Sequence, residues 1–229
     1  MQFTNSHLLA LGIQNGTSDS SLGDMKSPEA QTRFFSGLKL DRSRFLFLHQ
    51  IHGAEILEVH DEKDFAAYSR TPRRDADAWI MTLKNCGVVI QTADCVPLFM
   101  WDESARVLGL AHCGWRGVTS GLPEKLAARM SKLTHGRALS AHLGPHIRSC
   151  CFEIGTELKN RFAPAALSRK DGRLFADLSR EIAARLAKAG IPETHLSQNP
   201  FCTKCSGEKL HSFRRTQRHD AMLSYVFMP

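Results

Sequence analysis

Short apolar runs separated by polar turns indicate a series of strands along the chain. We expect strands at residues 45–49, 55–60, 88–92, 96–101, 105–111 and 221–227. The polar segment Asp102-Glu103-Ser104 lies between two of these runs and predicts a hairpin turn. The stretch from 88 to 111 therefore contains three successive predicted strands.

Three segments carry helix start and stop signals. Ser27-Pro28-Glu29 supplies an N-cap, a first-turn proline and an acid, and Gly37 ends that helix. A second helix is predicted over residues 123–133. A third spans 176–189 and stops at Gly190 with a proline beyond it. Because no linker, repeat or low-complexity stretch interrupts these elements, we expect a single domain over residues 1–229.

The net charge of the chain limits the kinds of partner that we expect. The formal net charge is +7 and the isoelectric point is about 9.2, which favours an anionic partner, either a nucleic acid or a phosphorylated small molecule. The basic residues are dispersed, with Arg73-Arg74 and Arg214-Arg215 as the only adjacent arginine pairs, and no nucleic-acid-binding motif accompanies them. We therefore expect a small anionic partner and no nucleic acid.

The number of cysteines and the hydropathy of the chain indicate the cellular compartment that we expect. The chain has seven cysteines, an odd number, and Cys150 and Cys151 are neighbours, which is typical of a reducing environment. Residues 1–16 lack the basic start and long apolar core of a signal peptide. No apolar run is long enough to span a bilayer. These features predict a cytoplasmic protein without a membrane partner, either a monomer or a homodimer.

Three candidate metal ligands stand at the edges of predicted strands. They are His52, Cys95 and His112. Imidazole nitrogen and thiolate together suit zinc or copper, and three protein ligands leave a fourth position for water or substrate, as in a catalytic site. Their separations match no local metal-binding motif. A hydrogen-bonded structural histidine and a buried, inert cysteine therefore remain the alternative interpretation of each residue.

The segment after His112 has two interpretations. Gly114-Trp115-Arg116-Gly117 leads toward the predicted helix at 123, and glycines ahead of a helix expose backbone N–H groups that suit an anion. Arg116 adds a possible charge-assisted bond to phosphate. The pattern is not a P-loop, so the glycines equally fit a tight turn without a ligand.

Cys202 and Cys205 have the spacing of a metal-binding pair. The chain has no second Cys-x-x-Cys, and His211 and His219 are wrongly spaced for a zinc finger. The zinc deaminase signature is also incomplete, since Phe201 precedes Cys202 in place of proline. Structural packing is the favoured interpretation of this pair.

Four segments resemble, in order and spacing, the signatures of the YfiH-type laccase-domain family. The family forms Q-V-H-G, T-A-D-C, H-A-G-W-R-G and L-G-P-A-I correspond to residues 50–53, 92–95, 112–117 and 143–147. The likeness continues through residues 150–155 and 212–215, so it covers nearly the whole chain.

The resemblance implies a fold, a metal site and an activity. The fold is α+β, a four-layer α/β/β/α sandwich with mixed sheets. The metal ligands carry over to His52, Cys95 and His112, with Zn²⁺, or alternatively Cu²⁺, as cofactor. The activity is purine nucleoside phosphorolysis, including that of methylthioadenosine, together with adenosine deamination, so the partners are purine nucleosides and phosphate. Arg116 and Arg215 are the candidate phosphate-binding residues.

One departure from the family pattern lies near the start of the chain. The family form T-R-x-G-G-V-S corresponds to residues 12–18, where Ile13 stands in place of the arginine. If that arginine contacts phosphate, phosphorolysis is weakened here. Alternatively, Lys26 or Arg33 supplies the charge, or Ile13 lies outside the site.

Three other functions remain open at this point. A copper-dependent polyphenol oxidase is the older label of the family, although one Cys-His-His site offers too few ligands for several coppers. A hydrolase with Cys95 as nucleophile and His52 or His112 as base uses the same residues. A non-catalytic protein with a structural zinc normally needs four protein ligands.

Overall fold

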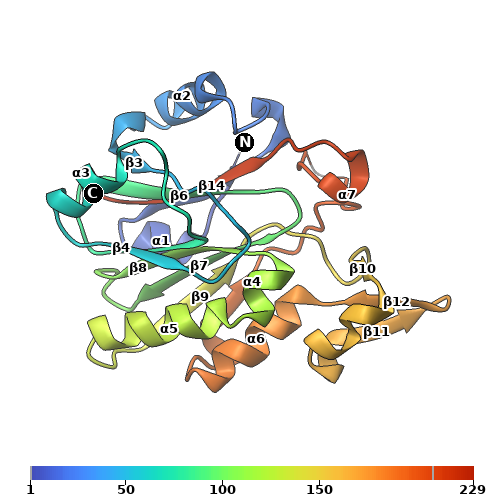
Figure 1. The fold of residues 1–229 in the computed structure, drawn as a ribbon. Coiled ribbons are helices and arrows are strands. Elements are labelled where there is room, and N and C mark those ends of the chain that lie inside the picture. The colour runs from blue at the N-terminus through green and yellow to red at the C-terminus, as the bar shows by residue number, and fades with distance from the viewer. Residues whose placement is uncertain (1, 208) are drawn as a thin grey trace.

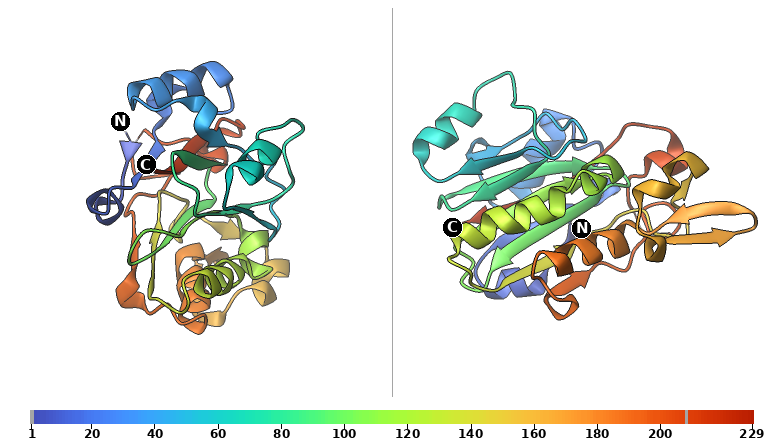
Figure 2. Two further views of the ribbon diagram at one scale, coloured as in Figure 1. Left: turned by 90° about the vertical axis from the view of Figure 1, so that its left-hand side faces the viewer. Right: turned by 60° about the horizontal axis from the view of Figure 1, so that its bottom comes forward.

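The computed structural model describes residues 2–207 and 209–229. Two mixed β-sheets pack face to face at the centre, with α2 outside one sheet and α5 and α6 outside the other (Figures 1 and 2). This arrangement confirms the predicted α/β/β/α layering with mixed sheets. Within the described residues, the helices are all too short or too polar to cross a membrane.

The helices and 3₁₀ turns have the following bounds. The α-helices are α1 Ser6–Ala10, α2 Pro28–Gly37, α3 Glu62–Tyr68, α4 Trp115–Thr119, α5 Leu122–Leu133, α6 Leu178–Lys188 and α7 Phe213–Thr216. The 3₁₀ turns are η1 Ser20–Leu22, η2 Arg42–Arg44, η3 Thr156–Arg161, η4 Pro164–Ala166 and η5 Glu193–His195.

The strands form two large sheets and one small one. The first sheet has the order β1-β2-β14-β6-β3, with β1 Gln2–Phe3, β2 Gln14–Ser18, β14 Met222–Met228, β6 Cys86–Thr92 and β3 Phe45–Leu46. The second has the order β13-β9-β7-β8-β5-β4, with β13 Leu196–Gln198, β9 Leu139–Leu143, β7 Val96–Asp102, β8 Leu108–Cys113, β5 Ala78–Met81 and β4 Ile56–Val59. A small sheet joins β10 Glu153–Ile154, β12 Arg173–Ala176 and β11 Leu167–Lys170.

Alternate residues of the central strands separate into different cores. In β6, Val88 and Ile90 face the core between the two sheets, whereas Val89 joins the core under α2. In β7, Phe99 faces the inter-sheet core, whereas Leu98 packs toward the helices on the other side. Because both faces of these strands are buried, their sequences are almost uninterrupted apolar runs.

Two helices cover the outer face of the second sheet. α5 and α6 lie side by side there (Figures 1 and 2). The buried face of α5 includes Leu126 and Met130, and that of α6 includes Ile182 and Leu186. Apolar positions recur three or four residues apart in both helices, which is the spacing of one helical face.

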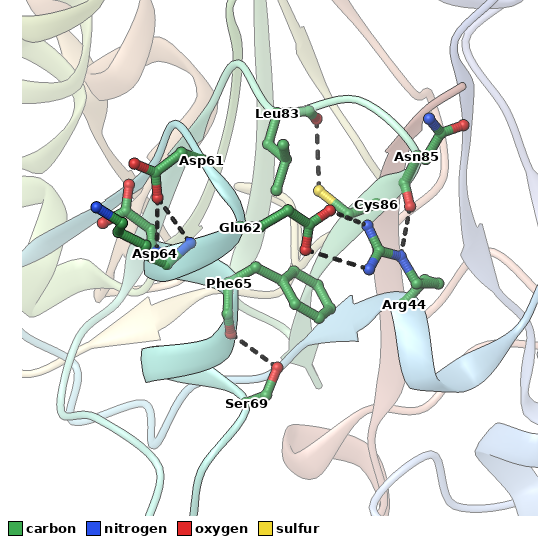
Figure 3. Close-up of polar contacts among 10 residues, drawn as sticks. Arg44, Asp61, Glu62, Asp64, Phe65, Ser69, Leu83, Asn85 and Cys86 are labelled. Atoms are coloured by element: carbon green, nitrogen blue, oxygen red, sulfur yellow. Dashed lines mark hydrogen bonds and ion pairs between the residues drawn. The ribbon is translucent and has the colours of Figure 1, made fainter.

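A polar corner attaches α3 to the first sheet (Figure 3). Asp61 caps α3 by accepting the amides of Lys63 and Asp64. Arg44 pairs with Glu62 at 2.9 Å and also donates from Nε to the Asn85 carbonyl. This partly exposed ion pair adds little stability by itself, so the burial of Phe65 in the inter-sheet core is what mainly holds α3 in place.

Most predicted elements are present, with differences at two strands. The first helix spans 28–37 with Ser27 as its N-cap, and the helices predicted at 123–133 and 176–189 are α5 and α6. The strand predicted at 45–49 pairs with β6 only at Phe45–Leu46. Further along, His49 forms an isolated bridge with Asp75, and the Gln50 side chain bonds the Gln91 backbone. The strand predicted at 105–111 begins at Leu108, because the Asp102 carboxylate accepts the amides of residues 106 and 107 and extends the turn.

Candidate metal centre

His52, Cys95 and His112 come together in the structure although they are far apart in sequence. One potential ligand atom from each lies within 4.8 Å of the others. His52 lies in the turn between β3 and β4, Cys95 where the chain passes from β6 in one sheet to β7 in the other, and His112 near the end of β8. Because β7 pairs with β8 so that Pro97 opposes His112, the start of β7 brings Cys95 beside that histidine.

Asp77 organises the turn that contains His52. Its carboxylate accepts the backbone amides of Ile51, His52 and Gly53 at 3.3, 3.0 and 2.6 Å. His52 has a left-handed φ of 58°, which is uncommon for a residue with a side chain. Three amides held by one buried carboxylate stabilise this conformation, and Asp77 therefore fixes the position of the His52 side chain.

Asp77 also orients His112. The Nδ1 of His112 lies 2.8 Å from Oδ1 of Asp77, so the other ring nitrogen, Nε2, is the one available to the centre. Burial alone would raise the pKa of Asp77, but the hydrogen bonds from His112 and from the Gly53 amide outweigh it, and the pKa is lowered. The ionised carboxylate is thus the stable form beneath the candidate ligands.

The charges of Cys95 and His112 stabilise each other. Burial disfavours the thiolate, yet the neighbouring His112 and His52 lower the pKa of Cys95 to about 6. Burial likewise disfavours the imidazolium, while Cys95 and Asp77 raise the pKa of His112. A thiolate beside two imidazoles and above a buried carboxylate is a donor set that fits zinc or copper.

Cys113 is adjacent to His112 but is not part of this centre. Successive residues of β8 face opposite sides of the sheet, and Cys113 packs in the core beneath α5 and α6. Burial raises its pKa well above the usual value, so this thiol stays neutral.

A second buried carboxylate fixes the turn that presents Cys95. Asp94 has a left-handed φ of 84°, and its Oδ1 accepts the Thr203 hydroxyl at 2.6 Å. Its Oδ2 accepts the Arg214 amide at 2.8 Å, and its carbonyl accepts the Ile147 amide at 2.9 Å. Three distant segments of the chain therefore anchor the residue that precedes Cys95.

The two glycines after His112 allow close packing. A Cβ atom on Gly114 would lie 3.0 Å from Nδ1 of His52 and 3.1 Å from Sγ of Cys95. A Cβ atom on Gly117 would lie 2.6 Å from the Gly53 carbonyl oxygen. The glycines thus have a structural role here, which is the tight-turn interpretation of this segment. The helix that follows directly, α4, spans only Trp115–Thr119.

The three residues face a cavity of about 1070 Å³. This volume is slightly above the usual range of small-molecule sites, which ends at about 1,000 Å³. Aromatic side chains from Trp115, Phe152 and Phe213 line it. Four basic side chains also line it, namely Lys26, Arg73, Arg116 and Arg214. A cavity that combines aromatic surface with several cations suits a ligand with a flat base and an anionic group.

The candidate phosphate-binding residues occupy different environments. Arg116 lines the cavity, with its guanidinium 4.6 Å from the centre of the Trp115 ring. Arg215 does not contribute to the lining. Its guanidinium donates instead to the carbonyls of Thr203, Lys204 and Leu210. The neighbouring Arg214 occupies the position expected of Arg215, because it lines the cavity and its guanidinium lies over the Phe152 ring.

Ile13 lies outside the site. It is 4% exposed and packs in the inter-sheet core with Leu8 and Leu46. Of the alternatives for position 13, the structure therefore favours the one in which the residue lies outside the site. Lys26, the alternative source of charge, lines the cavity.

Two residues that support the centre were not singled out as site residues from the sequence. Asp77 immediately precedes the apolar strand β5, and an acidic residue at the edge of such a run is the signal that could have identified it. Thr203 lies inside the Cys202–Cys205 segment, and its contact with Asp94 has no counterpart in sequence spacing.

Comparison with known proteins identifies relatives of the chain. A family model described as multi-copper polyphenol oxidoreductase laccase matches residues 14–229. A purine nucleoside phosphorylase of Aquifex aeolicus is 33% identical over 156 residues, covering 68% of this chain and 72% of that protein. The purine nucleoside phosphorylase ORF3 of Streptomyces griseus is 29% identical over 196 residues, covering 83% and 77%. An adenosine deaminase from an unknown prokaryotic organism is 30% identical over 149 residues, covering 61% and 56%.

Solved structures share the fold. The hypothetical protein YfiH of Bacillus licheniformis superposes with a TM-score of 0.84 at 22% identity, covering 95% of this chain and 93% of that one. YlmD of Geobacillus stearothermophilus gives the same TM-score and identity, with 95% and 92% coverage.

Proposed function

The chain belongs to the multi-copper polyphenol oxidoreductase laccase family, and we propose that it is a zinc-dependent purine nucleoside phosphorylase that also deaminates adenosine. The observation that carries the proposal is the convergence of His52, Cys95 and His112 on one wall of a large cavity that four cations also line. The relatives whose names include purine nucleoside phosphorylase and adenosine deaminase support the substrate class. Methylthioadenosine belongs to the same class and is included in the proposal.

His52, Cys95 and His112 would hold the zinc ion. When bound by these three residues, Zn²⁺ would supply a Lewis acid beside the cavity. Asp77 keeps Nε2 of His112 directed toward the centre and fixes the His52 turn. The hydrogen bonds of Asp77 thus hold His52 and His112 in position before an ion binds.

The basic residues would bind and orient phosphate. In phosphorolysis a phosphate oxygen forms a bond to the anomeric carbon while the bond between that carbon and the purine nitrogen breaks, and the base leaves with the bonding electrons. Arg116 and Arg214, with Lys26 and Arg73, supply positive charge to offset the phosphate dianion. Guanidinium groups suit this role because they bind oxyanions with two parallel hydrogen bonds.

The aromatic side chains would hold the base. Trp115 and Phe213 lie on the same cavity as the candidate ligands and offer flat apolar surfaces to a purine ring. Deamination replaces the amino group at C6 with oxygen from water and does not involve phosphate. The two reactions therefore share the base-binding surface and differ in their use of the cations.

Product analysis tests the proposal. The purified protein is treated with chelator, reloaded with zinc and incubated with adenosine or inosine, with and without phosphate. We expect adenine or hypoxanthine only with phosphate, inosine from adenosine without it, and loss of both activities in Cys95→Ala. Cys86→Ala is the matched control, because Cys86 is buried on β6 away from the cavity lining.

The alternatives give different outcomes. A polyphenol oxidase would oxidise phenols with copper and oxygen and leave nucleosides intact. A Cys95 hydrolase would retain its activity after chelation, and a structural zinc protein would show no turnover. If adenosine and inosine both remain intact with zinc and phosphate present, the purine proposal is wrong.

A further inference from the structure

Four cysteines outside the candidate centre form a compact cluster. The sulfur atoms of Cys150, Cys151, Cys202 and Cys205 all lie within 4.8 Å of one another. Cys150 and Cys151 lie in the segment between β9 and β10, and Cys202 and Cys205 lie between β13 and α7 (Figure 1). The cluster therefore joins two loops that are about fifty residues apart in sequence.

The distances match a shared metal ion better than a disulfide. Cys150 Sγ and Cys205 Sγ are 3.5 Å apart, and all four cysteines have free thiols. A disulfide requires about 2.0 Å between sulfur atoms. Four sulfurs placed tetrahedrally at about 2.3 Å from a zinc ion lie about 3.8 Å from one another. Small side-chain movements would bring the cluster to that geometry.

Backbone amides already surround the most buried of the four sulfurs. Cys202 Sγ accepts the Arg148 amide at 3.4 Å, and the amides of Lys204 and Cys205 also bond to it. Amides two and three residues after the first cysteine of a Cys-x-x-Cys turn point at its sulfur, and such donors favour the thiolate, which is the form that binds metal.

Positive charge lies beside the cluster. Four thiolates and one Zn²⁺ carry a net charge of −2. Arg215 donates to the carbonyls of Thr203 and Lys204, and Arg148 donates to the Asn199 carbonyl, so both guanidiniums are fixed on the loop that carries Cys202 and Cys205. These charges offset that of a tetrathiolate site.

We propose that Cys150, Cys151, Cys202 and Cys205 bind a structural zinc ion through four thiolates, separately from His52, Cys95 and His112. The thiol protons pass to solvent as the ion binds. Four protein ligands leave no open position, so the ion has a structural role. The adjacent pair Cys150-Cys151 takes the place of the second Cys-x-x-Cys whose absence favoured simple packing in the sequence.

The site would act on the candidate catalytic centre through Thr203. This residue lies between Cys202 and Cys205, and its hydroxyl donates to the Asp94 carboxylate at 2.6 Å. Its amide donates to the His146 carbonyl at 3.0 Å. A zinc ion that fixes this loop thereby fixes the turn that presents Cys95.

Zinc content tests the proposal independently of the proposed activity. All variants carry Cys95→Ala, which removes a ligand of the other centre. In that background we expect one zinc ion per chain to remain. Adding Cys205→Ser or Cys150→Ser should remove this ion, whereas adding the matched control Cys86→Ala should not. Cobalt in place of zinc should give the intense visible absorption of a tetrahedral thiolate site, also lost in Cys205→Ser. Equal zinc content in Cys205→Ser and Cys86→Ala would overturn the proposal.

Thiol reactivity in the otherwise unchanged protein provides a test that does not depend on the folding of a variant. We expect Cys150, Cys151, Cys202 and Cys205, identified by peptide mass, to resist alkylation until a chelator is added. A Cys150–Cys205 disulfide, detected as a mass lower by two hydrogen atoms, would overturn the proposal. Immediate alkylation of Cys150 and Cys205 in protein purified with zinc would do the same.

Discussion

The Nδ1 atom of His112 lies 2.8 Å from the Oδ1 atom of Asp77, and both residues are almost completely buried. The same carboxylate oxygen accepts the backbone amide of His52 at 3.0 Å. One acidic side chain therefore determines the orientation of two of the three candidate metal ligands. The backbone amide of His112 also donates to the Asp77 carbonyl at 2.7 Å, which ties the two residues together at main-chain level.

Asp77→Asn should weaken metal binding more than it weakens folding. The amide is close in shape to the carboxylate but removes the negative charge beneath His112. Its NH₂ group also cannot accept hydrogen bonds, whereas both oxygens of the Asp77 carboxylate do. Loss of such an outer partner typically reduces metal affinity about 10–100-fold. Competition with a chromogenic chelator measures the zinc affinity.

The matched control is Asp75→Asn. Asp75 is an exposed acid that pairs with His49 and does not contact the three candidate ligands. We expect the zinc affinity of the Asp75→Asn variant to equal that of the unchanged protein. If the unchanged protein and the Asp77→Asn variant bind zinc with equal affinity, this carboxylate has no role at the centre.

Replacing the basic lining residues should separate the two proposed reactions. Arg116→Ala and Arg214→Ala each remove a positive charge from the cavity, so we expect a higher KM for phosphate and a smaller effect on deamination, which uses water. Each charge-assisted bond contributes about 1.5–3 kcal/mol, or roughly 10–150-fold in affinity. Initial rates at varied phosphate concentration measure the change. Arg173→Ala, in an exposed pair with Glu153, is the control.

Sequence patterns identified most of the layers because burial leaves a regular signature. Strands β6 and β7 and helices α5 and α6 have the apolar spacing that their buried faces require. β5 and β9, of four and five residues, were not predicted. The strand predicted at 45–49 is shorter than expected, since beyond Leu46 the Gln50 side chain bonds the Gln91 backbone.

The candidate site was only partly predictable. Motif resemblance pointed to His52, Cys95 and His112, but their proximity depends on a crossing between two sheets that local patterns do not reveal. Arg214 and Arg215 are adjacent in sequence, and which of them lines the cavity is set by the tight turn of α7. The cysteine cluster combines an adjacent pair with a spaced pair, which matches no linear motif.

Asp102 should contribute to stability at neutral pH and lose that contribution in acid. It is fully buried at the end of β7, and burial alone would raise its pKa, but bonds from Ser104, Val107 and Arg137 lower it overall. A carboxylate whose pKa is lowered by folding stabilises the protein above its unfolded pKa of about 3.9, and this contribution is lost as the pH falls through the lower folded value. Asp102→Asn should therefore be less stable at pH 7 by about 1–3 kcal/mol.

The pH dependence distinguishes this effect from a loss of packing. In urea denaturation, the difference between the two proteins should shrink as the pH is lowered below about 4, because the natural carboxyl group then becomes protonated. A difference that stays constant down to pH 2 would show that the charge of Asp102 does not contribute. Glu103→Gln, an exposed neighbour, is the control and should match the unchanged protein.

Ile13→Arg should destabilise the fold and should not improve phosphate use. Ile13 is 4% exposed in the inter-sheet core, where a guanidinium would be buried without a partner. We expect a loss of about 3–5 kcal/mol in the free energy of unfolding, compared with about 0.5–1.5 kcal/mol for the control Ile13→Val. Urea denaturation of the zinc-loaded proteins measures both. An Ile13→Arg variant that is as stable as the unchanged protein and has a lower KM for phosphate would show that position 13 can reach the cavity after all.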